Sequence, residues 1–541
     1  MAARYRLFSS IYRILVSPRR FLSGIPPCTP EEGTTKAICG ANRTPTGLVL
    51  GVFTSMNAAG VCTSVRLTHA AERFNEATCG RLVEAIKAGG RPPLKGEARL
   101  LFDLHPDFGA VAAVGLGEEC AGWDETEEID HGKEDIRNAA ALGVRKLQKL
   151  GVSKIQVESF GHAESSAEGA ALGMWRFQEF KNKRSQLPMP PLELHNDCDY
   201  TGWTIGLEKA SAQNLARQLT DMPANLLTPT FFAQRAVDIL CNSGINVEIK
   251  VQGWAETQKM GAFLSVAKGS CEPPIFLELS YYGASYDERP IVLVGSGVTY
   301  DSGGLCLKHP KELVHMRGSM AGAAVVVATT RALAAMHMPI NIRGLIPLCE
   351  NMPGCNSYKP GDIVTAMNGK SIRVQSTDME ARLVLADALY YAQNFWPRFI
   401  IDVGTLTREA EQSLGGACAA VFTNSDFLWD SLHMSGVHTG DRVWRMPLWR
   451  HYSRQVLKSA STDMKNVGLD EGGLCKAAAF LREFVPCGEW MHIDVRGIFR
   501  TNGHENHYLH KGMSGRPTRT LIEFISQMIC KYCPSLTKSH A

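Results

Sequence analysis

The sequence has little net charge, no long apolar run and no regular cysteine spacing. Its formal net charge is +3 over 541 residues, and the basic residues are scattered among nearly as many acids, so no nucleic acid partner is expected. The apolar runs near Val111 and Ile291 have the length of strands, so no transmembrane segment is expected either. The 16 cysteines show no paired spacing, which indicates reduced thiols rather than a disulfide framework.

The first 30 residues also contain no acidic residue. Basic and apolar side chains alternate in this stretch, which contains Arg4, Arg6, Leu7, Ile11, Arg13, Ile14, Leu15, Arg19, Arg20, Phe21 and Leu22. This composition is typical of a mitochondrial transit peptide. We therefore expect residues 1–32 to direct the protein to the mitochondrial matrix, with cleavage between Arg20 and Glu32. A basic amphipathic helix on a membrane surface and a disordered basic tail are the alternatives.

Length and pattern predict two α/β domains, because 45% hydrophobic residues are ample for two sizeable cores. Residues 45–200 contain short β runs separated by helical patterns, which predicts a smaller N-terminal α/β domain. A connecting helix is expected in residues 201–228. Residues 229–525 alternate apolar strands with helices, which predicts a larger C-terminal α/β domain with a twisted sheet flanked by helices. Residues 526–541 are expected to form a tail.

The expected strands are 48–54, 99–104, 110–116 and 155–160 in the first domain, and 247–250, 275–279, 291–294, 340–346, 399–403 and 491–493 in the second. A helix-like pattern of apolar residues covers 168–183. In a twisted sheet of this class, ligands bind beyond the carboxyl ends of the strands. Acidic motifs at such positions are therefore the candidates for a site.

Residues 375–389 (QSTDMEARLVLADAL) place two acids at the start of an amphipathic helix. Apolar residues recur at helical spacing from Leu383 onward, so Asp378 and Glu380 lie at the helix entry, where free backbone N–H groups favour anions. Two carboxylates beside Arg382 can hold a divalent cation. Such a pair is also common as a solvated helix cap, so this motif alone leaves both interpretations open.

A second stretch, residues 290–308 (PIVLVGSGVTYDSGGLCLK), predicts a buried strand, a glycine-rich turn with Asp301, and then Lys308. Together with residues 347–352 (PLCENM) and 402–407 (DVGTLT), these motifs resemble the leucyl aminopeptidase family of di-metal exopeptidases, and in particular its animal branch. The resemblance runs from residue 45 to residue 525. It also includes the segments 214–217 (NLAR), 223–225 (PAN) and 511–517 (KGMSGRP).

The resemblance implies a site in which five side chains hold two metal ions. It assigns Asp301, Asp378 and Glu380 as metal ligands. It further implies that Lys308 is the lysine that polarises the substrate and that Arg382 is the arginine that assists catalysis. Without metals the three carboxylates would repel one another unless they were protonated or paired, and the lysine and the arginine are then the expected counter-charges.

Two of the family's five ligands are replaced in this chain. Ser296 stands where the family has a lysine, and Ser319 stands where it has an aspartate. Both losses fall on the same metal, and a hydroxyl is a poor ligand for a divalent cation compared with a carboxylate. We therefore expect at most one divalent metal, Mn or Zn, per subunit, or none. Ala381, Arg408 and Arg496 also depart from small residues of the family, and the arginines would add bulk and charge near the pocket.

Two functions are compatible with this pattern. The first is a non-catalytic or severely impaired relative that serves a structural, assembly-forming role. The second is an active metalloaminopeptidase that releases N-terminal residues such as leucine from peptides with altered metal use. The depleted ligand set favours the first, because the chemistry depends on a pair of cations.

The degenerate site resembles those of the insect sperm leucyl aminopeptidases, which are mitochondrial proteins of sperm, and the leader is compatible with that group. The resemblance to the family also implies a homohexamer, in which the C-terminal domains meet around the threefold axis. Peptides are expected as partners only if activity is retained.

Overall fold

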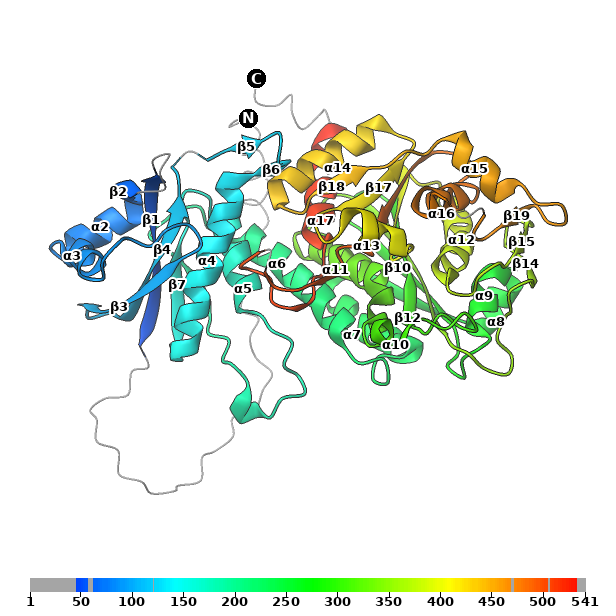
Figure 1. The fold of residues 1–541 in the computed structure, drawn as a ribbon, viewed down its shortest axis with the longest axis horizontal. Coiled ribbons are helices and arrows are strands. Elements are labelled where there is room, and N and C mark those ends of the chain that lie inside the picture. The colour runs from blue at the N-terminus through cyan, green and yellow to red at the C-terminus, as the bar shows by residue number, and fades with distance from the viewer. Residues whose placement is uncertain (1–44, 57–61, 120, 469–470, 505, 533–541) are drawn as a thin grey trace.

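The computed structural model describes residues 45–56, 62–119, 121–468, 471–504 and 506–532. Two α/β domains lie side by side, the N-terminal one coloured blue to cyan and the C-terminal one green to red in Figure 1. The expected leader, residues 1–32, lies outside the described residues.

Within the described residues, the N-terminal domain contains a six-stranded sheet in the order β3-β4-β1-β7-β8, with β2 paired to β1. Its strands are β1 (Thr46–Met56), β2 (Cys62–Leu67), β3 (Ala98–His105), β4 (Phe108–Gly117), β7 (Lys154–Glu158) and β8 (Leu192–His195). The strands β1, β4, β7 and β8 are parallel, whereas β2 and β3 pair antiparallel with their neighbours. The four apolar runs expected as strands correspond to β1, β3, β4 and β7.

Within the described residues, four helices accompany this sheet, namely α2 (His69–Ala77), α3 (Arg81–Ala88), α4 (His131–Leu150) and α5 (Ala163–Met174). The helix expected from the pattern over 168–183 ends earlier than predicted, because Trp175 adopts an extended conformation at the end of α5. The guanidinium of Arg217 lies 4.3 Å from the centroid of the Trp175 ring. The apolar spacing after Met174 therefore reflects side chains that pack from a loop.

The helix α6 (Tyr200–Asp221) connects the two domains. It packs against α5 of the N-terminal domain and against α11 (Ala321–Ala335) of the C-terminal domain. It lies in the expected connecting segment, 201–228, and ends before Pro223, which cannot continue a helix. The next helix, α7 (Pro229–Leu240), begins with proline in its first turn, where a missing N–H has no cost.

The described part of the C-terminal domain contains a nine-stranded sheet in the order β18-β17-β20-β16-β11-β13-β10-β9, with β12 paired to β13. Its strands are β9 (Asn246–Val251), β10 (Ile275–Tyr282), β11 (Ile291–Gly295), β12 (Gly297–Asp301), β13 (Asn341–Asn351), β16 (Phe399–Gly404), β17 (Ala419–Thr423), β18 (Val443–Arg445) and β20 (Glu489–Asp494). The central strands β13, β11, β16 and β20 are parallel, so their carboxyl ends lie at one edge.

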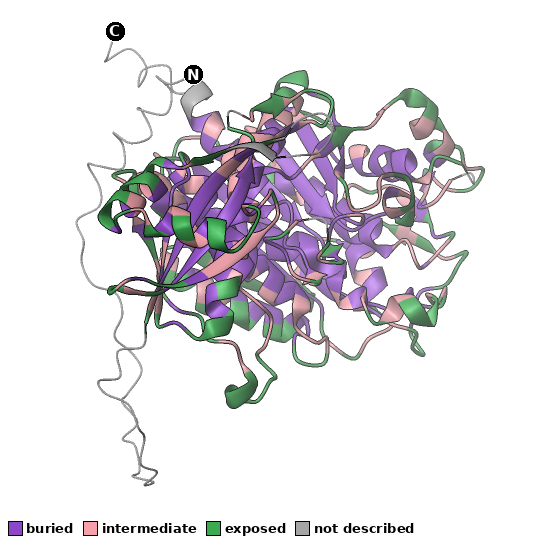
Figure 2. Ribbon diagram, turned by 60° about the vertical axis from the view of Figure 1, so that its left-hand side comes forward, coloured by how far each residue is buried: buried purple, intermediate pink, exposed green. Residues whose placement is uncertain are grey.

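Both faces of this sheet are buried, as the interior of Figure 2 shows. Alternate residues of β11 point to opposite faces, so Ile291 and Leu293 pack in one core while Val292 and Val294 pack in the other. The first core includes residues of α7, α11, α14 (Asp426–Thr439) and α17 (Thr518–Tyr532), and the second includes residues of α9 (Gly261–Ala267), α12 (Glu380–Ala392) and α16 (Gly473–Arg482). The expected α/β fold with a twisted sheet flanked by helices is confirmed.

The described chain also contains shorter helices and strands. They are β5 (Trp123–Asp124), β6 (Ile129–Asp130), α8 (Gln252–Thr257), α10 (Pro310–Leu313), β14 (Ile363–Thr365), β15 (Ser371–Arg373), α13 (Arg408–Leu414), α15 (Arg450–Leu457), β19 (Met464–Lys465), β21 (Arg500–Thr501) and β22 (Gly512–Met513). A tail was expected from residue 526, but α17 continues to Tyr532. Met528 and Ile529 are buried in the C-terminal core, so this part of the chain is a packed helix.

One stretch of the described chain, Met316–Ala335, is long and apolar enough by composition to cross a membrane. Of its apolar window, 89% is buried inside the protein. This stretch ends in α11, which contacts α6, α17 and β11. It is therefore a core helix of the C-terminal domain, and the strand-sized runs near Val111 and Ile291 are not the longest apolar segments.

Candidate metal centre

Three carboxylates from two separate segments meet at the carboxyl edge of the large sheet. Asp301 is the last residue of β12, Glu380 is the first residue of α12, and Asp378 lies in the turn before that helix. One oxygen of each carboxyl group lies within 4.8 Å of the others, and Asp301 and Glu380 are buried. The structure therefore brings together the three acids that the sequence analysis selected as metal ligands.

A buried asparagine holds the two acidic segments together. The side-chain amide of Asn351, at the end of β13, donates to Oδ1 of Asp301 at 2.8 Å and to the carbonyl of Thr377 at 3.0 Å. The backbone N–H of Gly303 also donates to Oδ1 of Asp301 at 2.8 Å, from a turn with φ of 88° that favours glycine. Asn351 belongs to the motif of residues 347–352, but no sequence pattern indicated its role in the site.

The ammonium of Lys308 lies between two of these carboxylates. Its Nζ atom is 2.8 Å from Oδ2 of Asp301 and also pairs with Oδ1 of Asp378. Burial acts to lower the pKa of Lys308, but the charges of Asp301, Glu380 and Asp378 outweigh burial and raise that pKa. Lys308 is therefore the expected counter-charge to the acids, and it is held in its charged form.

Three carboxyl groups lie around one ammonium group, and the pKa values of Glu380 and Asp378 are raised. Burial is the main cause that raises the pKa of Glu380 well above its ordinary value, and the neighbouring charges of Asp301 and Asp378 raise it further. Burial likewise raises the pKa of Asp378, although Lys308 opposes the change. An additional cation at this position would relieve the repulsion between the carboxylates.

Arg382 does not pair with the acids, contrary to the expectation from the sequence. Its guanidinium donates to the carbonyl of Asn466 and contacts the sulfur of Met379 at 3.3 Å. The physical reason is helical geometry, because residues two positions apart on a helix do not face each other, and Glu380 and Arg382 both lie on α12. Burial lowers the pKa of Arg382 to about 10.

The two serines that the resemblance aligns with metal ligands of the family are both buried. Ser296 lies between β11 and β12, is 0% exposed, and its hydroxyl oxygen has no hydrogen-bond partner among the described residues. Ser319 is 2% exposed and precedes α11, and its carbonyl accepts a hydrogen bond from the hydroxyl of Thr405 at 3.1 Å. Each offers only a neutral hydroxyl, so the residues at these positions do not fit a second divalent ion.

The remaining carboxylates do fit a single divalent ion. Asp301, Asp378 and Glu380 would hold it, and a bound ion of this kind acts as a Lewis acid toward a carbonyl oxygen. Because the Lys308 ammonium contacts the same two aspartates, it competes with a cation for their oxygens. The chain's own lysine thus partly satisfies the charge that a metal would balance.

The arginines that depart from the family pattern differ in burial. Arg496 is 7% exposed, its guanidinium lies 3.4 Å from Glu411, and its positive charge acts to lower the pKa of Asp378. The side chain of Arg408 is mostly exposed and pairs with Glu312 at 3.0 Å. Ala381 is buried in the core beneath α12. Only Arg496 therefore adds charge at the site itself.

Comparisons with known proteins agree with this geometry. The catalytic-domain model of the cytosol aminopeptidase family matches residues 214–522, and the model of that family's N-terminal domain matches residues 49–184. The chain belongs to the cytosol aminopeptidase family. It is 46% identical over 492 residues to the cytosol aminopeptidase of Xenopus tropicalis, covering 90% of this chain and 94% of that protein. It is 46% identical over 484 residues to the Homo sapiens protein, covering 88% and 92%.

Solved structures are also similar to this chain. The bottromycin maturation enzyme BotP in complex with Mn matches with a TM-score of 0.76 and 29% identity, covering 90% of this chain and 99% of that chain. A mutant of tomato leucine aminopeptidase matches with a TM-score of 0.75 and 26% identity, covering 91% and 95%. The resemblance to the leucyl aminopeptidase family, close to its animal members, is confirmed.

Proposed function

We propose that this chain is a cytosol aminopeptidase homologue with a depleted two-metal site, and that it is catalytically inactive or severely impaired. The observation that carries the proposal is the burial of two neutral serines, Ser296 and Ser319, at the positions of two lost ligands. Two cations held close together are needed to activate a water molecule and to stabilise a tetrahedral oxyanion. A site that holds at most one Mn or Zn ion lacks that pair.

The proposed role is a structural subunit of a homohexamer in the mitochondrial matrix. The acid-free leader supports the compartment. The similarity to the insect sperm leucyl aminopeptidases supports a role in sperm. Family membership over nearly the whole chain supports an assembly like that of the family, because both domains match.

An active metalloaminopeptidase with altered metal use is the second candidate. Asp301, Asp378, Glu380, Lys308 and Arg382 are all retained, and the first four lie together around one candidate ion position. On this alternative, the chain would release N-terminal residues such as leucine from peptides with a single bound ion.

The experiment that separates the two functions measures metal content and turnover on the purified full chain. Elemental analysis should find at most one Mn or Zn ion per subunit after dialysis. Hydrolysis of leucyl amide should be at least about a thousandfold slower than by the Xenopus tropicalis enzyme, which corresponds to about 4 kcal/mol of lost transition-state stabilisation. A rate within about tenfold of that enzyme would establish the second candidate instead.

The assembly part of the proposal has its own measurement. Light scattering on the same preparation should report about six subunits per particle, because both domains of the family are present. A stable monomer at micromolar concentration would remove the structural role while leaving the loss of activity to be judged separately.

A further inference from the structure

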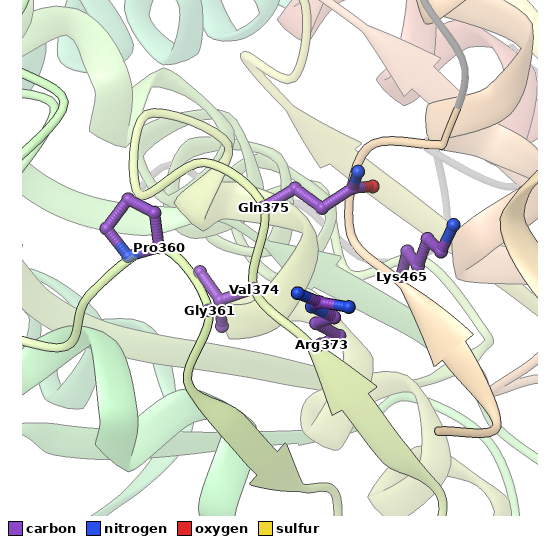
Figure 3. A pocket seen from close by; sticks show the side chains of 6 residues that line it. All are labelled: Pro360, Gly361, Arg373, Val374, Gln375 and Lys465. Atoms are coloured by element: carbon purple, nitrogen blue, oxygen red, sulfur yellow. The ribbon is translucent and has the colours of Figure 1, made fainter. Parts of the chain in front are cut away.

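A cavity of about 450 Å³ opens beside the turn that leads to Asp378. Figure 3 shows the side chains that line it, which come from the loop before β14, from β15 and the residues after it, and from β19. The lining residues are Pro360, Gly361, Arg373, Val374, Gln375 and Lys465. None of the three candidate metal ligands lines it, so this cavity is separate from the metal centre.

Two positive side chains are neighbours in this cavity. The strands β15 and β19 pair in parallel, with Arg373 opposite Lys465. Like charges at directly opposed positions repel each other. Nearby lysines of the same region are compensated, since Lys359 lies 3.5 Å from Asp362 and Lys370 lies 2.7 Å from Glu483.

The cations of the cavity lack such compensation. Among the residues that the structure describes, the side chains of Arg373 and Lys465 form neither an ion pair nor a hydrogen bond. Gln375 adds a further donor, because its side-chain oxygen accepts from the backbone N–H of Gly468 at 2.9 Å and its amide nitrogen is left to donate. Among the described residues, the lining therefore presents three donor groups, of which two are charged, and no carboxylate.

We propose that this cavity binds a small organic oxyanion, with its phosphate or carboxylate group between Arg373 and Lys465. The planar guanidinium can donate two parallel hydrogen bonds to such a group, and the ammonium adds a point charge. The volume lies in the range of small-molecule sites and exceeds what an inorganic ion needs. The ligand is therefore an anion with an organic body rather than a bare ion.

The cavity is connected to the metal centre through one buried residue. Asn466 follows Lys465, its side-chain oxygen accepts from the N–H of Gln375 at 2.7 Å, and its amide donates to the carbonyl of Ser376 at 2.7 Å. The carbonyl of Asn466 accepts the hydrogen bond from Arg382. A ligand held between Arg373 and Lys465 thus braces the segment that carries Asp378, whether or not the protein is an active peptidase.

The test is calorimetric titration of the purified full chain with phenyl phosphate and with citrate, in buffer that contains neither phosphate nor carboxylate. Saturable binding of either probe is expected, and the tighter of the two identifies the anionic group as phosphate or carboxylate. The double variant Arg373→Gln with Lys465→Gln should bind at least about tenfold more weakly, because two charge-assisted contacts are removed. Thermal unfolding without ligand establishes that this variant is folded.

The matched control is Lys458→Gln, which removes an exposed cation at the end of α15 that does not line the cavity. It should bind the probe as the parent does. Equal weakening in this control would show that the probe responds only to overall charge and would overturn the proposal. Failure of both probes to bind saturably to the parent would overturn it as well. Neither result depends on metal content or peptide turnover.

Discussion

The ammonium of Lys308 and the hydroxyls of Ser296 and Ser319 determine what the three acids can hold. Lys308 neutralises part of the carboxylate charge, with its Nζ atom 2.8 Å from Asp301. The serines contribute no charge, and the buried Ser296 hydroxyl has no partner among the described residues. An unpaired buried hydroxyl is unfavourable, so this position is tolerated rather than optimised for stability.

Restoring the two ligands should restore metal binding before it restores activity. The double variant Ser296→Lys with Ser319→Asp should bind one more Mn or Zn ion per subunit than the parent, because an amine and a carboxylate return to the depleted position. Leucyl amide turnover should rise only partly, since Arg496 still places charge beside the site. Elemental analysis and turnover on the same preparation check this.

The control is Ser296→Ala with Ser319→Ala, which changes the same positions without adding a ligand. It should bind no more metal than the parent. If the lysine and aspartate variant also gains no metal, the surrounding structure has lost the ability to hold a second ion, and the ligand set alone does not explain the depletion.

Among the secondary-structure elements, β7 ends in a buried carboxyl group that joins three elements of the N-terminal domain. Oε1 of Glu158 accepts from the backbone N–H of Gly51 on β1 at 2.9 Å, and Oε2 accepts from the hydroxyl of Thr68, which caps α2, at 2.9 Å. Burial raises the pKa of Glu158 to about 8, although both hydrogen bonds oppose the change.

This raised pKa makes stability depend on pH in a defined direction. Between about pH 4.5 and pH 8 the folded protein holds a proton on Glu158 that the unfolded chain has lost, so the free energy of unfolding falls as pH rises, by up to about 1.4 kcal/mol per pH unit. Glu158→Gln should reduce this slope, because glutamine accepts from Gly51 and donates to Thr68 without titrating. Urea unfolding at pH 5, 6, 7 and 8 checks it.

Glu193→Gln serves as the control, since Glu193 is a largely exposed carboxylate on β8 that pairs with Lys154 at the surface. Its slope with pH should match that of the parent. An unchanged slope in the Glu158 variant would show that Glu158 is charged throughout this range.

At the scale of the whole molecule, a buried ion cluster joins the two domains. Glu168 on α5 accepts from Nε of Arg137 on α4 at 2.6 Å and from Nη1 of Arg519 on α17 at 2.7 Å, and all three side chains are almost completely buried. Burial opposes the charge of Glu168, but Arg519 and Arg137 outweigh it and lower its pKa. The C-terminal helix is thereby fixed to the N-terminal domain.

Removing this carboxylate should weaken the domain interface. Glu168→Ala removes the carboxylate that two buried guanidinium groups share, although Arg137 keeps Glu134 and Arg519 keeps Gln213, and such a loss costs up to about 3–5 kcal/mol of stability. We expect a lower midpoint and a separation of the single thermal transition into two, as measured by calorimetry. Glu483→Ala removes a more exposed partner of Lys370 and should have a much smaller effect. Equal effects of the two substitutions would contradict a specific interdomain role.

The proposed mitochondrial location is tested on the segment outside the described residues. Residues 1–32 fused to a fluorescent reporter should move the reporter into mitochondria, because the segment is basic, amphipathic and almost free of acids. Replacing Arg4, Arg6 and Arg13 with glutamate in the same fusion should abolish import. A reporter that stays diffuse with the unchanged segment would remove the basis for the location.

The sequence by itself determined the fold class and the identity of the three acids. The fold class follows from apolar strands alternating with helices, and the role of the three acids follows from motifs that resemble the family. It also identified Ser296 and Ser319, because they stand inside motifs whose other residues match the family. It placed the end of α5 too late, since aromatic spacing alone does not distinguish a helix from a packed loop.

Only the tertiary structure decided how the charges are paired. Lys308 and Asp378 are 70 positions apart, and Asn466 is 84 positions from Arg382, so their contacts depend on which strands end at the same edge of the sheet. The direction of each side chain then determines its partner. Lys308 pairs with Asp301 and Asp378, whereas Arg382 donates to the carbonyl of Asn466. The pairing of Arg373 with Lys465 likewise required β15 and β19 to be neighbours, because strand pairing between distant segments is not encoded in local spacing.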